Sequence, residues 1–83
     1  MIITIRDERK TFAYDMEIAE EVSVDKAIKD IFEILNILNP EFPVDISRYK
    51  LFHNRTGRSL AGEESVQEAG IWNGDYITLV SRG

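Results

Sequence analysis

The only histidine of the chain, His53, is the first residue to consider for catalysis. Nucleophilic catalysis needs a serine, threonine or cysteine within hydrogen-bond reach of such a base, at a cleft. The chain has no cysteine, and its serines are scattered at positions 23, 47, 59, 65 and 81. Because His53 follows a predicted strand into a charged turn, we expect it at the surface, without a catalytic role.

Carboxylates offer a second kind of chemistry. The pairs Glu20-Glu21 and Glu63-Glu64 are adjacent in the sequence, whereas a glycosidase needs two carboxylates that face each other across a pocket. A single histidine among scattered carboxylates is also a poor set of ligands for a transition metal. The glycines fit turns better than a phosphate-binding loop. We therefore expect no enzymatic activity, no bound metal and no cofactor.

The remaining reactive group is the carboxylate of Gly83. A glycine has no Cβ, so it can pass through a narrow active site without steric cost. A separate enzyme could adenylate this carboxylate with ATP and transfer it to a nucleophile on another protein. The adjacent Arg82 could then dock onto an acidic groove of that enzyme. The alternative is that the glycine has no chemical role, and composition alone leaves both interpretations open.

Two strands and a helix are predicted in the first half of the chain. Residues 2–6 are rich in β-branched side chains, and residues 11–18 alternate between apolar and polar, which predicts an antiparallel hairpin. Ser23 is a good N-cap for a helix of about 15 residues, whose apolar positions recur three and four apart. Ile34 and Ile37, with Phe32, widen the apolar stripe of this helix, which indicates either deep burial or a surface kept for a partner.

The pattern of the second half of the sequence predicts three more strands. We expect them at residues 48–52, 59–60 and 76–80, with a short helical turn at 65–71 before the last one. A hairpin, one long helix and returning strands indicate an α+β domain, in which the helix covers one face of a mixed sheet. We expect the last strand to pair in parallel with the first. The domain is predicted to span residues 1–80, followed by a short tail at 81–83.

The charge and hydropathy of the chain limit the classes of partner that it can bind. The net charge is −5 and the pI about 4.8, which disfavours nucleic acid, because binding there depends on cations that neutralise phosphates. No run is long enough to insert in a membrane, and the N-terminus does not look like a signal peptide, so we expect a cytoplasmic protein. Carboxylates concentrate between residues 15 and 33 and cations between 48 and 58. This segregation indicates either two solvated faces or electrostatic steering of a protein partner.

Several strings resemble the ubiquitin superfamily, which has the β-grasp fold. The resemblance covers nearly the whole chain and is most specific in Ala69-Gly70-Ile71 followed by Asn73-Gly74-Asp75, which is similar to the YukD-like branch of bacterial ubiquitin-like proteins. The other similar strings are Met1–Ile5, Ser23–Val24 with Ile28 and Ile31, Val66–Ile71 and Asn73–Val80.

The resemblance implies two alternative functions. In one setting, YukD-like proteins are protein modifiers that work with activating enzymes, conjugating enzymes and JAB-type peptidases, and Gly83 with Arg82 would form the conjugated end. In the other, they are non-covalent accessories of type VII secretion. The tail of this chain has one glycine instead of the two of ubiquitin and is shorter. The modifier is our first expectation, with ATP bound by the activating enzyme and not by this chain.

A partner-binding surface is also implied by the resemblance. It would centre on outward positions of the third and last strands, which by alternation are Phe52 and Val80, flanked by Lys50 and Arg82. An apolar centre with cations at its rim is a common arrangement for a binding hot spot. The alternative is that these are ordinary scattered surface residues.

Overall fold

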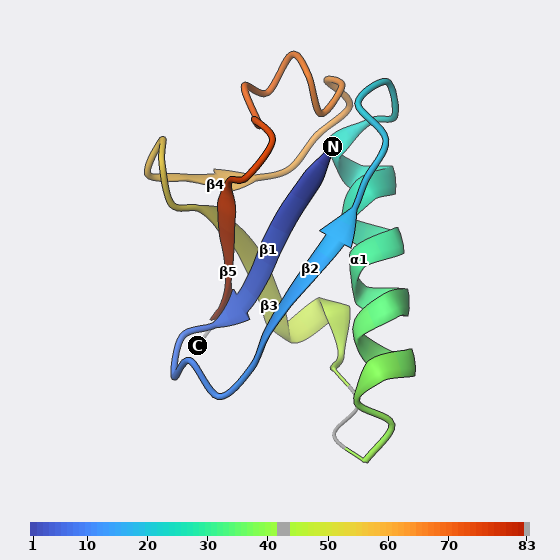
Figure 1. The fold of residues 1–83 in the computed structure, drawn as a ribbon, viewed down its shortest axis with the longest axis vertical. Coiled ribbons are helices and arrows are strands. Elements are labelled where there is room, and N and C mark those ends of the chain that lie inside the picture. The colour runs from blue at the N-terminus through green and yellow to red at the C-terminus, as the bar shows by residue number, and fades with distance from the viewer. Residues whose placement is uncertain (42–43, 83) are drawn as a thin grey trace.

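The computed structural model describes residues 1–41 and 44–82, and it contains a five-stranded sheet and one α-helix (Figure 1). A 3-10 turn, η1, precedes the third strand. In chain order the elements are β1 (Ile2–Asp7), β2 (Ala13–Glu17), α1 (Val24–Leu38), η1 (Ile46–Arg48), β3 (Tyr49–His53), β4 (Arg58–Leu60) and β5 (Tyr76–Ser81).

The two end segments of the chain form the centre of the sheet. The strand order is β2-β1-β5-β3-β4, and β1 pairs in parallel with β5, with Ile5 opposite Ile77. The other strand pairs are antiparallel. The predicted parallel pairing of the first and last strands is therefore confirmed, as is the hairpin of β1 and β2.

Helix α1 begins where the sequence predicts. The Ser23 hydroxyl accepts a hydrogen bond from the Lys26 N–H at 3.1 Å, which satisfies one of the free donors of the first turn. The helix covers one face of the sheet (Figure 1). The three residues that widen its apolar stripe differ in burial. Phe32 is buried and Ile34 half-buried, whereas Ile37 is 72% exposed.

The core lies between the helix and the sheet. Alternate residues of the central strands point toward the helix, as the period of two requires, and they are almost completely buried. These residues are Ile3, Ile5, Ile77 and Leu79. The predicted α+β class and β-grasp arrangement are confirmed. Within the described residues, no helix is long and apolar enough to cross a membrane.

Strand β5 is one residue longer than the sequence predicts. Ser81 still pairs with Tyr49 of β3, and the Arg82 N–H then donates to the Arg48 carbonyl oxygen at 2.9 Å. Sheet-like hydrogen bonding thus continues to the last described residue. Gly83 lies outside the described residues.

The burial of α1 predicts a sharp contrast between two isoleucines on the same helix. Ile31 is 2% exposed and Ile37 72% exposed. We expect Ile31→Ala to lower the free energy of unfolding by about 2–5 kcal/mol, because it leaves a cavity in the core. Ile37→Ala should change it by less than about 0.5 kcal/mol. Urea unfolding followed by circular dichroism measures both, and equal losses would contradict this packing of the helix.

Candidate functional site

Three of the four residues predicted to bind a partner lie together on the helix-free face of the sheet. Lys50 is directly opposite Val80, and Phe52 is opposite Thr78. Phe52 and Val80 are therefore diagonal neighbours on one face, within reach of each other. Lys50 is exposed, and the two apolar side chains are half-buried.

Arg82, the fourth residue, follows this pair at the end of β5. Its guanidinium Nε donates to the Tyr49 carbonyl oxygen at 3.0 Å, and the residue is exposed. We call Lys50, Phe52, Val80 and Arg82 the β3–β5 patch. It offers an apolar centre and two cations.

The prediction that His53 lies at the surface is wrong. Its side chain is completely buried, with 0% exposure. The alternation of β3 explains this, because Tyr49, Leu51 and His53 all point toward the core side. This signal was present in the sequence, but the charged turn that follows His53 obscured it.

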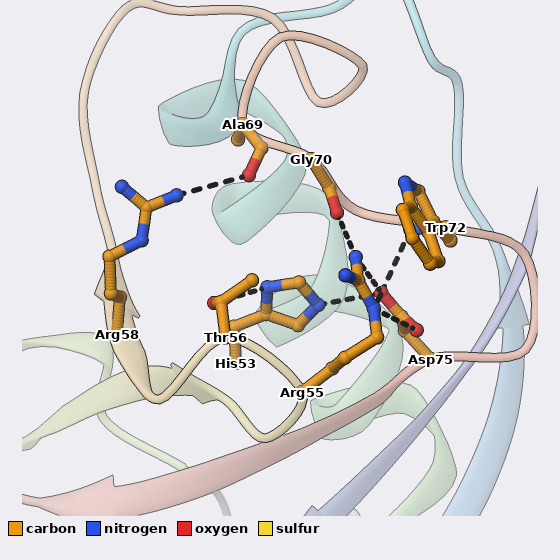
Figure 2. A network of polar contacts seen from close by, with 8 residues as sticks. All are labelled: His53, Arg55, Thr56, Arg58, Ala69, Gly70, Trp72 and Asp75. Carbon is orange, nitrogen blue, oxygen red and sulfur yellow. Dashed lines mark hydrogen bonds and ion pairs between the residues drawn. The ribbon is translucent and has the colours of Figure 1, made fainter.

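The buried imidazole bridges two segments that are distant in the sequence. Its Nε2 lies 2.6 Å from Oδ2 of Asp75, and its Nδ1 lies 2.9 Å from the Thr56 hydroxyl. Figure 2 shows this network of polar contacts from close by. It joins the turn after β3 to the segment that leads into β5.

Asp75 is the centre of the network. Its carboxylate accepts hydrogen bonds from Nε of Arg55 at 3.1 Å and from the Trp72 N–H at 2.8 Å. The Arg55 guanidinium also donates to the Gly70 carbonyl oxygen and lies over the Trp72 ring, 3.5 Å from its centroid (Figure 2). No buried side-chain nitrogen or oxygen of the described residues is left without a hydrogen-bond partner.

These contacts set the ionisation of Asp75. Burial raises the pKa of this carboxyl, but the Arg55 hydrogen bond, the Trp72 N–H and His53 together outweigh it and lower the pKa to about 2. Asp75 is therefore a carboxylate at neutral pH. Its negative charge is compensated by the guanidinium beside it.

A hydroxyl, an imidazole and a carboxylate follow one another in this network, as in a catalytic triad. They belong to Thr56, His53 and Asp75. Catalysis requires the base to reach a substrate, and His53 has no exposed surface. The carboxylate is also ion-paired with Arg55. We interpret the network as a structural connection between the two loops. Within the described part of the chain, no cluster of three or more potential ligand side chains could hold a metal ion.

Comparisons with known proteins agree on one family and one fold. The sequence profile of the family described as "WXG100 protein secretion system (Wss), protein YukD" matches residues 1–79. Among solved structures, "Caldiarchaeum Subterraneum Ubiquitin" is similar at a TM-score of 0.72 and 19% identity, covering 100% of this chain and 94% of that one. A ubiquitin-like domain of an Arabidopsis thaliana protein is similar at 0.71 and 15%, covering 100% and 78%. No curated protein matches the chain.

The low pKa of Asp75 predicts how stability depends on pH. The carboxyl titrates at 3.8 when unperturbed and at about 2 in the folded protein. Its contribution of about 2 kcal/mol is therefore complete above about pH 5 and is lost as the pH falls toward and through about 2. Urea unfolding between pH 7 and about pH 2 measures this loss.

Two variants separate this contribution from that of other carboxylates. The Asp75→Asn variant should have a lower free energy of unfolding at pH 7. Between pH 7 and about pH 2, that free energy should fall by about 2 kcal/mol less than in the unmodified protein. Asp30→Asn instead removes a half-exposed carboxylate that is paired with an exposed lysine, and it should keep the acid-induced loss of the unmodified protein. If Asp75→Asn and Asp30→Asn gave the same curve, the network would not hold Asp75 as argued.

Proposed function

The chain belongs to the YukD family of ubiquitin-like proteins, and on that premise we propose that it is a non-covalent protein-binding domain that works with the secretion system named in the family description. It would bind a protein partner through the β3–β5 patch. In this proposal the protein acts in the cytoplasm, without enzymatic activity or cofactor of its own.

The observation that carries the proposal is the composition of the helix-free face. Phe52 and Val80 are diagonal neighbours there and remain partly exposed, although most apolar side chains of the sheet point toward the core. Aromatic side chains with cations beside them are frequent at binding hot spots. Lys50 and Arg82 are exposed at the rim of this pair, so they favour an acidic partner and its rapid association.

Substitutions in the patch test this proposal. Phe52→Ala and Lys50→Glu should each weaken binding of a protein of the WXG100 secretion system from the same organism by at least about tenfold, because the first removes the apolar centre and the second reverses a rim charge. Binding is measured by calorimetry with purified proteins.

The matched control is Ile37→Asp, which changes an exposed apolar residue of α1, on the opposite side of the sheet. It should bind as the unmodified protein does. Circular dichroism confirms that each variant is folded. Normal binding by folded Phe52→Ala and Lys50→Glu would refute a role for the patch.

A second candidate function is that of a covalent protein modifier. The observation that favours it is Arg82-Gly83 directly after β5. A free Gly83 carboxylate would attack the α-phosphate of ATP on an activating enzyme and release pyrophosphate. An enzyme thiol would displace AMP, and a target amine would displace the thiol to form an amide. The hydrogen bonds of Arg82 to Arg48 and Tyr49 would have to open for the tail to extend.

Deleting Gly83 distinguishes the two functions. If the protein is a modifier, incubation with ATP and an activating enzyme of the same organism gives an adduct that intact mass spectrometry detects, and the deletion abolishes it. If it is only a binding domain, no adduct forms and the deletion leaves partner binding unchanged. Adduct formation that survives the deletion would exclude Gly83 as the reacting group.

A further inference from the structure

The outer edge of β2 has hydrogen-bonding groups that the sheet does not use. Ile18 exchanges hydrogen bonds with Met1, at 2.9 and 3.0 Å, so the backbone of Ile18 points toward β1. In an antiparallel pair these directions alternate along the strand. The N–H and C=O groups of Ala13, Asp15 and Glu17 therefore point away from the sheet. None of them has a hydrogen-bond partner among residues 1–41 and 44–82.

A small groove lies beside the end of this edge, between β2 and α1. Its volume is about 240 Å³. Figure 1 shows β2 at the margin of the sheet, next to the helix. The apolar residues that line the groove are Ile18, Ala19, Val22, Ala27 and Ile34. An aliphatic side chain that entered it would be removed from water.

Carboxylates predominate around the groove and the middle of this edge, although Arg6 of β1 lies opposite Ala13 at the start of β2. The carboxylates of α1 that line the groove are Asp30 and Glu33, and none of the described residues that line it is cationic. Lys26 of α1 is paired with Asp30 at 2.6 Å. On the other side of the edge, Asp15 is exposed on the helix-free face. A ligand at this edge would therefore meet carboxylates on both of its sides.

We propose that β2 and this groove bind an extended segment of another protein, in which aliphatic residues alternate with Lys or Arg. The segment would add as a further strand and use the free backbone groups of Asp15 and Glu17. Its aliphatic side chains would enter the groove, because alternate residues of a strand share a face. Its cations would face Asp15 and Glu17 on the other face.

A second copy of this chain fits the edge poorly. Antiparallel pairing of β2 with itself would set Asp15 and Glu17 against the same carboxylates, and like charges in opposite positions destabilise a sheet. The other edge strand, β4, spans only Arg58–Leu60. A foreign segment with cations is therefore the better occupant.

The test uses a ten-residue peptide of alternating valine and lysine, added to the full chain at about 150 mM salt. Backbone NMR should show shifts confined to residues 13–19 and to the helix around 30–34. The amides of Asp15 and Glu17 should exchange more slowly with solvent, because they become hydrogen-bonded. Ala19→Phe should fill the groove and weaken binding at least about tenfold, whereas Ala61→Phe, at an exposed site outside the groove, should not.

Two control peptides separate strand addition from general attraction to an acidic surface. A valine–glutamate peptide should not bind, and a valine–lysine peptide interrupted by prolines should bind much more weakly, because proline has no N–H to donate. Equal binding of the proline peptide, shifts centred on Phe52 and Val80, or protection of the β2 amides by self-association without peptide would each overturn the proposal. Phe52→Ala should leave peptide binding unchanged, which keeps this test independent of the β3–β5 patch.

Discussion

The parallel pairing of β1 with β5 is the constraint on which the rest of the structure depends. Residues 72 positions apart in the chain meet here, with Thr4 opposite Tyr76 and Ile5 opposite Ile77. Each strand then has one outer neighbour, β2 beside β1 and β3 beside β5. A shift of one residue between β1 and β5 would turn every inward isoleucine toward solvent. The burial of the central side chains against α1 therefore fixes the register, and the register in turn places Lys50 opposite Val80.

The His53–Asp75 network supports this pairing at the entry to β5. A buried charge is costly unless it is paired and hydrogen-bonded, and here Arg55, His53 and the Trp72 N–H compensate the Asp75 carboxylate. The segment before β5 is thus attached to the turn after β3, and the Asp75 carbonyl oxygen accepts from the Thr4 N–H of β1 at 2.9 Å. The network holds these two loops in one geometry, because removing any one partner would leave a buried polar group unsatisfied.

Local patterns in the sequence were enough to predict most of the fold. The alternation in β2, the three- and four-residue spacing in α1 and the cap at Ser23 each depend on neighbouring residues only, and the structure confirms them. The β3–β5 patch followed from the same alternation. What the sequence did not reveal is contact between distant residues: Arg55 and Asp75 are 20 residues apart, and nothing local marks them as partners. His53 was misplaced because the charged turn after it obscured the alternation of β3, and the distant Asp75 that makes its burial tolerable could not be foreseen.

The two candidate binding surfaces lie on different parts of one rigid sheet and differ in charge. The β3–β5 patch has cations at its rim, whereas the β2 edge is bordered by carboxylates. The strand order is β2-β1-β5-β3-β4, so β1 separates the two surfaces. A partner bound at one surface would therefore leave the other surface accessible. A domain built in this way would hold an acidic and a basic partner at a fixed separation, and binding of the first would raise the effective concentration of the second. This arrangement would give a small domain a specific role in the assembly of protein complexes.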